Sequence, residues 1–175
     1  MREARVLDVF SYIGGWALRA AAFGARTVAC VDSSAVALEA AAHNAKLNSV
    51  ELEVIKGQAL DTLKQLRDQQ RQFEVVIVDP PALIKRKKEA DAVLEHYAAL
   101  NRAALQLGAP GGTLVSCSCS HHLEAEQLQR VLLREARTTK RRLLILEQGG
   151  QGPDHPVHPA IPETRYLKTF YCHVG

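Results

Sequence analysis

The sequence lacks the features that mark membrane-spanning, secreted and zinc-binding proteins. No apolar run reaches the length of a transmembrane helix, and the N-terminus does not show the charged-then-apolar order of a signal peptide. The four cysteines form no C-x-x-C pair and show no spacing typical of zinc ligands. We therefore expect a reduced, cytoplasmic protein that is not bound to a membrane and holds no metal.

A strong net charge is also absent. The 175 residues are 47% hydrophobic, which excludes a disordered chain, and they suffice for one domain, expected to span residues 1–175. The formal net charge is only +3, but basic residues cluster at 85–88 and again at 134–142. Either cluster can contact the phosphates of a nucleic acid. A solvated loop and a polar helix face remain open as alternatives.

Strand and helix patterns alternate along the whole chain. This alternation predicts an α/β fold with a mostly parallel seven-stranded sheet and helices on both faces. A turn is expected at 110–112, and a long loop rich in proline and glycine at 149–162. The predicted strands are 6–10, 27–31, 52–55, 73–78, 113–118, 143–146 and 166–173, and the predicted helices are 17–23, 35–47, 62–71, 90–107 and 123–137.

The turn after the first predicted strand contains paired glycines, Gly14 and Gly15, directly before a predicted helix. Glycines at such a turn let the backbone approach a ligand closely, with the helix N-terminus behind it. The dinucleotide fingerprint G-x-G-x-x-G is absent, so a pyrophosphate would have a poor cradle. Asp32 ends the second strand 24 positions after Asp8, near the spacing at which a carboxylate meets a ribose. The pattern favours S-adenosyl-L-methionine, which carries a ribose and an adenine but no phosphate.

Five successive predicted strands end in polar residues. In sheets of this type, ligands bind at the carboxyl ends of the strands, so we expect a cofactor site at that edge. The predicted cofactor-binding residues are Asp8, Phe10, Ser11, Tyr12, Gly14, Gly15, Asp32, Ser33, Gln58, Ala59 and Asp79.

Two cysteines, Cys117 and Cys119, mark the end of the fifth predicted strand. A thiolate is a strong nucleophile, and its addition to C6 of a pyrimidine makes C5 reactive enough to accept a methyl group. Cys119 at the strand's exit is the predicted nucleophile, whereas Cys117 inside the strand is expected to be a buried apolar residue. Because residues two apart share a face of a strand, geometry alone leaves both cysteines open.

The fourth predicted strand ends in Asp79-Pro80-Pro81. Neither proline has an N–H donor, so the turn is rigid and fixes the Asp79 carboxylate near the reactive end of the cofactor. We expect Asp79 to be the second catalytic residue, accepting a hydrogen bond from the amino group of a nucleobase. Substrate contacts are predicted for Pro80, Pro81, Lys85, Arg86, Lys87 and Lys88, the last four through RNA phosphates.

Over nearly its whole length, the chain resembles the catalytic domain of the bacterial class I 23S ribosomal RNA (cytosine-C5) methyltransferases. The resemblance lies in residues 6–15, 31–34, 78–81, 118–120, 154–156 and 166–168. It implies a Rossmann-like S-adenosyl-L-methionine-dependent methyltransferase fold, 23S ribosomal RNA as partner and Cys119 as the nucleophile. The family usually begins with an RNA-binding PUA domain and a small linking domain, which this sequence does not show. Gln58 stands where many such enzymes place an aspartate near the adenine.

Two other functions remain open at this point. An RNA methyltransferase that acts on a base nitrogen, such as one of guanine, would use Asp79 as a polar hook and leave Cys119 as a bystander. A non-catalytic module of the same fold would bind RNA or a partner protein without methyl transfer. The first alternative depends on whether Cys119 is essential, and the second on whether the cofactor binds at all.

Overall fold

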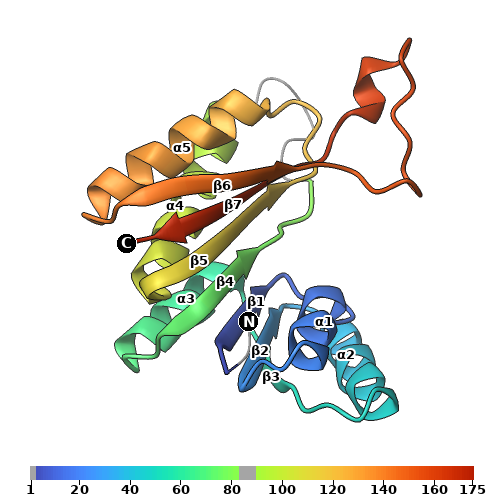
Figure 1. The fold of residues 1–175 in the computed structure, drawn as a ribbon, viewed down its shortest axis with the longest axis vertical. Helices are drawn as coiled ribbons and strands as arrows, with labels where there is room; N and C mark the ends of the chain where they lie inside the picture. Colours follow the sequence, from blue (N-terminus) through green and yellow to red (C-terminus); the bar gives the residue numbers. More distant parts are fainter. Residues whose placement is uncertain (1–2, 83–89) are drawn as a thin grey trace.

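A computed structural model describes residues 3–82 and 90–175, which build a seven-stranded sheet (Figure 1). The strand order is β3-β2-β1-β4-β5-β7-β6. Neighbours among β1 to β5 are parallel, whereas β7 runs antiparallel to both β5 and β6. The expected α/β fold with a mostly parallel sheet is confirmed. The strands are β1 (Arg5–Val9), β2 (Thr27–Asp32), β3 (Glu53–Lys56), β4 (Phe73–Val78), β5 (Gly108–Ser118), β6 (Leu143–Gly149) and β7 (Lys168–Val174).

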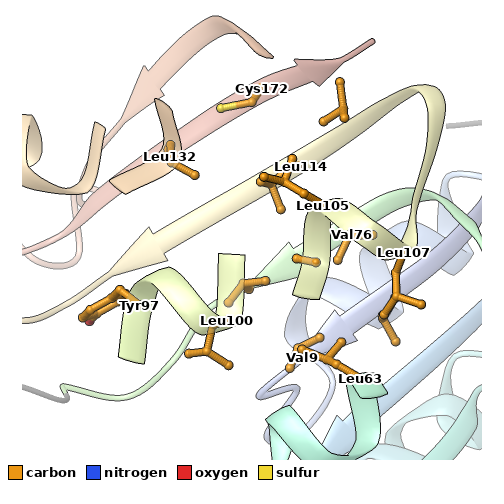
Figure 2. Close-up of a cluster of buried hydrophobic side chains, with 14 of the residues drawn as sticks. Val9, Leu63, Val76, Tyr97, Leu100, Leu105, Leu107, Leu114, Leu132 and Cys172 are labelled. Carbon is orange, nitrogen blue, oxygen red and sulfur yellow. The ribbon is translucent and has the colours of Figure 1, made fainter. Parts of the chain in front are cut away.

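Helices cover both faces of the sheet because the strands alternate their side chains between two apolar clusters. In β1, Leu7 belongs to the cluster that packs against α3, α4 and α5, and Val6 to the cluster that packs against α1 and α2. Figure 2 shows the first cluster, to which three helices contribute Leu63, Tyr97 and Leu132. In the described part of the chain, no helix combines the length and apolarity needed to cross a membrane. The helices are α1 (Gly15–Ala22), α2 (Ala35–Leu47), α3 (Ala59–Asp68), α4 (Ala90–Leu107) and α5 (Ala125–Thr138).

The prediction of a turn at residues 110–112 is wrong. These residues belong to β5, where the pairing with β4 shifts register between Phe73 and Val75. Gly111 takes a φ of 78°, and a Cβ on Gly112 would lie 2.8 Å from the carbonyl oxygen of Glu74. The two glycines therefore accommodate an irregularity inside a strand, which a Pro-Gly-Gly signal resembles in sequence.

The third helix also begins earlier than expected, at Ala59 rather than at residue 62. Gln58 is its N-cap residue, with an extended backbone and no capping hydrogen bond from its side chain. The shift matters for the site because it brings the N-terminus of α3 directly to the end of β3.

Residues 150–167, here called the arm, leave the sheet after β6 and return to it at β7 (Figure 1). The arm contains a short 3₁₀ helix, Pro162–Thr164, and is held by internal bonds such as that from the His158 amide to Thr164 Oγ1, 2.8 Å. Because β6 and β5 both run antiparallel to β7, the arm leaves from the edge at which β5 ends.

Candidate functional site

The carboxyl ends of β1, β2 and β4 meet at one edge of the sheet. Val9, the last residue of β1, lies opposite Val31 on one side and Val78 on the other. The loops that follow these strands are therefore neighbours, as the sequence predicted. β5 adds its own end to this edge, since Ser116 pairs in register with Val78.

The loop after β1 has an unusual backbone. Phe10 and Tyr12 take left-handed φ angles of 67° and 48°, and the amides of Phe10 and Ser11 both donate to the carbonyl of Val31. Gly14 has φ 87° and is the N-cap of α1, and a Cβ on it would lie 3.3 Å from the Cβ of Ala41. A Cβ on Gly15 would meet nothing within 4 Å, so the space in front of the helix N-terminus is open.

Asp8 lies beneath this loop and is fully buried. Its Oδ2 accepts a hydrogen bond of 3.1 Å from the Ala17 amide, while its Oδ1 has no hydrogen-bond partner among the described residues. Burial raises the pKa of the Asp8 carboxyl to about 7, opposed by the Ala17 bond and reinforced by the charges of Asp79 and Asp32. Asp8 thus ties α1 to β1 and keeps an unused acceptor under the turn.

Asp32 connects two of the strand-end loops. Its Oδ2 accepts from the Tyr12 amide and its Oδ1 from the Ser34 amide, both at 2.9 Å. The carboxylate is partly exposed, and the neighbouring Ser33 is exposed. Since a carboxylate offers about four acceptor positions, two remain for a ligand.

The end of β3 joins Asp32 through a bond from the Gly57 amide to the Asp32 carbonyl, 3.0 Å. Gln58 follows with an exposed side chain, and partly buried Ala59 begins α3. These two predicted residues lie beside the Asp32 loop and do not line the pocket at the end of β1.

An open pocket of about 440 Å³ lies between the loop after β1 and the end of β4. Two of its lining residues are bonded to each other: the indole Nε1 of Trp16 donates a 3.0 Å hydrogen bond to Oδ2 of Asp79. Trp16 was not among the predicted residues, although it is the chain's one tryptophan and directly follows the paired glycines. The pocket is lined by Phe10, Ser11, Tyr12, Ile13, Gly15, Trp16 and Asp79.

The structure separates the two cysteines that the sequence left open. β5 ends at Ser118, so strand alternation does not extend to Cys119, which is half-buried with its Sγ 3.7 Å from the Pro80 carbonyl oxygen. Cys117 is fully buried, and its Sγ accepts from Thr169 Oγ1 at 3.5 Å. Burial and the charge of Asp79 raise the pKa of Cys117 to about 12. Cys119 is therefore the accessible thiol beside the Asp79-Pro80 turn.

Several groups hold the segment that follows β5. The buried hydroxyl of Tyr97 bonds to Ser118 Oγ at 2.8 Å and to Ser120 Oγ at 3.2 Å. Lys168, also missed as a site residue, is buried and donates to the carbonyls of Ser120 and Leu123. Burial and the Asp79 charge raise the pKa of the Cys119 thiol, while a backbone hydrogen bond at Cys119 and, to a smaller extent, the charge of Lys168 lower it.

The remaining predicted substrate residues are only partly placed. Pro80 is buried beside Cys119 and Pro81 is exposed. The basic cluster of Lys85, Arg86, Lys87 and Lys88 lies outside the described residues. Among the described residues, no group of three or more histidine, cysteine, aspartate or glutamate side chains is arranged to hold a metal ion.

Residues 1–140 match the model of the family described as Conserved hypothetical protein 95. The chain belongs to this family. Curated relatives include a "Ribosomal RNA large subunit methyltransferase I" from Cronobacter sakazakii, 37% identical over 99% of this chain and 45% of the relative. The protein of that name from Vibrio parahaemolyticus is 36% identical over the same shares. The chain thus spans about half the length of these relatives. Their names agree with the expected resemblance at the level of a ribosomal RNA methyltransferase family.

Solved structures share the fold at low sequence identity. A Streptococcus mutans protein assigned as an S-adenosylmethionine-dependent methyltransferase superposes with a TM-score of 0.85 at 19% identity, over 98% of this chain and 45% of that one. NSun6 from Pyrococcus horikoshii gives a TM-score of 0.70 at 18% identity, over 98% and 47%. The fold is that of Rossmann-like methyltransferases.

Proposed function

We propose that this chain is the catalytic part of an S-adenosyl-L-methionine-dependent methyltransferase that acts on large-subunit ribosomal RNA. The names of the curated relatives support the RNA substrate and the reaction. We propose further that the methyl group goes to C5 of a cytosine. The observation that carries this finer proposal is the thiol of Cys119, half-buried 3.7 Å from the carbonyl of Pro80 and next to the carboxylate that Trp16 holds.

The residues at the strand edge fit S-adenosyl-L-methionine. The open space before α1 and the pocket beside Asp79 suit the methionine end, and the unused acceptor positions of Asp32 suit the two ribose hydroxyls. Gln58 and Ala59 lie beside Asp32, where the adenine of a cofactor held this way would extend. When bound, the cofactor supplies an electrophilic methyl group and leaves as a neutral thioether.

On the substrate side, Cys119 is the nucleophile. Its thiolate adds to C6 of the cytosine, the S–C6 bond forms, and the electron pair of the C5–C6 double bond moves to C5, which then accepts the methyl group. After the transfer, the C5 proton passes to water or a nearby base, the C6–S bond breaks and the thiolate returns. Asp79 accepts from the exocyclic amino group and holds the ring edge. The base must be unstacked to enter such a site.

The identity of the methylated nucleoside tests the proposal. Ribosomal RNA is incubated with the protein and methyl-labelled S-adenosyl-L-methionine, digested to nucleosides and separated by chromatography. We expect the label in 5-methylcytidine, and none with Cys119→Ser. Label in a methylated guanosine would replace the proposal with methylation of a base nitrogen. A protein that does not bind the cofactor would be a non-catalytic module.

A further inference from the structure

Lys168 is a buried lysine at the start of β7. The residue is 8% exposed and pairs in register with Ser118, the last residue of β5. The ammonium donates to the carbonyl oxygens of Ser120, at 2.6 Å, and of Leu123. Within the described ranges it forms no ion pair with a carboxylate. Both acceptors belong to the turn that directly follows Cys119.

Such a position is costly for a charged group. A buried ammonium loses its hydration, and two carbonyl dipoles replace that only in part. Burial accordingly lowers the pKa of Lys168, while a negative charge on Cys119 raises it. If Lys168 served only to hold the turn, a neutral donor would do so without the cost of the charge. Among the described groups, Cys119 is the one whose ionised form raises the pKa of Lys168, so its thiolate is the candidate partner for this charge.

Among the residues that the structure describes, the other groups around Cys119 do not supply a matching positive charge. Asp79, at the end of β4, is negative and raises the pKa of the thiol, as burial does. Tyr97 of α4 has a raised pKa and its hydroxyl is engaged with two serines. His121 and His122 follow in the same turn, both with exposed side chains. Within the described ranges, Lys168 is thus the buried cation that, together with a backbone hydrogen bond at Cys119, opposes the effects of burial and of the Asp79 charge on the pKa of this thiol.

We infer that Lys168 is a positioning residue that holds the turn after β5 and stabilises the thiolate of Cys119 through its charge. The inference deepens the proposed function, because it assigns an electrostatic partner to the proposed nucleophile. Lys168 need not touch the RNA. Its charge favours the thiolate before addition to C6 and again when the C6–S bond breaks, with the thiol proton passing to solvent in the free protein.

The ionisation of Cys119 provides a test that needs no RNA. The rate of alkylation by iodoacetamide is measured from pH 6 to pH 10, and the modified cysteine is mapped by mass spectrometry. The three other cysteines are buried, so Cys119 reacts first. In Lys168→Met, we expect the midpoint of the Cys119 rate-against-pH curve to rise by about one pH unit. At pH values below the midpoint, the alkylation rate should then fall about tenfold. Lys168→Arg keeps the charge and should stay near the parent midpoint, and Lys46→Met, an exposed lysine in α2, is the matched control.

A reciprocal measurement covers the case in which Lys168→Met does not fold. Coupling between two titrating groups is mutual, so removing the thiolate must lower the pKa of Lys168 by the same amount as Lys168 lowers that of Cys119. Cys119→Ala, with lysines labelled at Cε, allows Lys168 to be titrated by NMR. A lowered midpoint supports the inference. An unchanged Cys119 midpoint in folded Lys168→Met, or an unchanged Lys168 midpoint in Cys119→Ala, would leave Lys168 a purely structural residue.

These results are distinguishable from failure of the proposed function. Label recovered in guanosine would overturn cytosine methylation and leave the measured coupling between Lys168 and Cys119 in place. Conversely, 5-methylcytidine formed by a protein without this coupling would keep the reaction and remove Lys168 from it.

Discussion

The indole of Trp16 donates a 3.0 Å hydrogen bond to the carboxylate of Asp79, and this bond joins the loop after β1 to the turn after β4. The first loop belongs to the proposed cofactor pocket and the second to the proposed substrate site. Asp79 therefore has a fixed orientation before any ligand arrives, while its remaining acceptor positions suit a base. The bond spans 63 positions in the sequence.

Replacing Trp16 with phenylalanine keeps an aromatic ring in the pocket but removes the donor. A hydrogen bond to a charged acceptor is worth about 1.5–3 kcal/mol, so kcat/KM for methyl transfer should fall at least about tenfold. Steady-state kinetics with ribosomal RNA measure this, with Phe23→Leu, an exposed aromatic at the end of α1, as control. Equal kinetics in Trp16→Phe and the parent would show that Asp79 does not depend on this bond.

Asp32→Ala should weaken cofactor binding by about tenfold or more, because two hydrogen bonds to a charged acceptor are lost. Binding can be followed by calorimetry or by the emission of Trp16, the one tryptophan in the chain, which lies in the pocket. Asp68→Ala, at the far end of α3, is the control for loss of a carboxylate. Since Asp32 also orders the Tyr12 and Ser34 amides, a thermal melt should accompany the titration. Unchanged affinity would remove Asp32 from the cofactor site.

Exchanging each cysteine for serine should separate chemistry from packing. Cys119→Ser offers a far weaker nucleophile, so methyl transfer should fall to background while cofactor binding persists. Cys117→Ser places a hydroxyl in a buried position and should cost about 1–3 kcal/mol of stability while activity remains measurable.

With 5-fluorocytosine in the RNA, fluorine blocks loss of the C5 substituent, so a covalent complex should accumulate through Cys119. Peptide mapping of the trapped complex identifies the attached residue. An adduct on Cys117 would exchange the roles of the two cysteines, and activity retained in Cys119→Ser would favour methylation of a base nitrogen.

Asp8 should make stability depend on pH. Its folded-state pKa is raised to about 7, whereas an unfolded aspartate titrates near 3.9. Between these two pKa values the folded protein binds a proton that the unfolded chain does not. The free energy of unfolding is therefore highest below about pH 4 and falls as the pH rises from about 4 to about 7. The free energy of unfolding should fall by up to about 1.4 kcal/mol per pH unit in that window. Asp8→Asn should flatten this dependence in urea titrations at pH 5, 6, 7 and 8, and parallel curves for the two proteins would contradict the assignment.

The strands, the paired glycines and the polar residues at the strand ends could be predicted because their signals are local. Gly14 sits next to the helix it caps, and Asp32 ends the strand that positions it. The order β5-β7-β6 could not be read from the sequence, since the last strand inserts between two earlier ones. Lys168 comes close to Cys119 only through that insertion, so its burial had no local signal.

The choice between Cys117 and Cys119 also could not be made from the sequence pattern alone, although the two residues are close in the sequence. Alternation places residues two apart on one face only while the strand continues, and β5 ends between Cys117 and Cys119. Whether the strand stops at residue 118 or continues through residue 119 thus decides whether the two thiols share a face. The bond between Trp16 and Asp79 depends on both loops at once, although the position of Trp16 after the glycines was a usable signal.

The insertion of β7 between β5 and β6 also affects the order in which the strands can pair while the protein is being synthesised. Among the residues that the structure describes, β6 pairs with β7 and with no other strand, so β6 cannot join the sheet until residues 168–174 have been synthesised. Lys168 arrives with the same strand. A nascent chain that has folded β1 to β5 would therefore carry the thiol of Cys119 without the charge of Lys168, and the proposed nucleophile would gain this neighbour only once β7 has paired with β5.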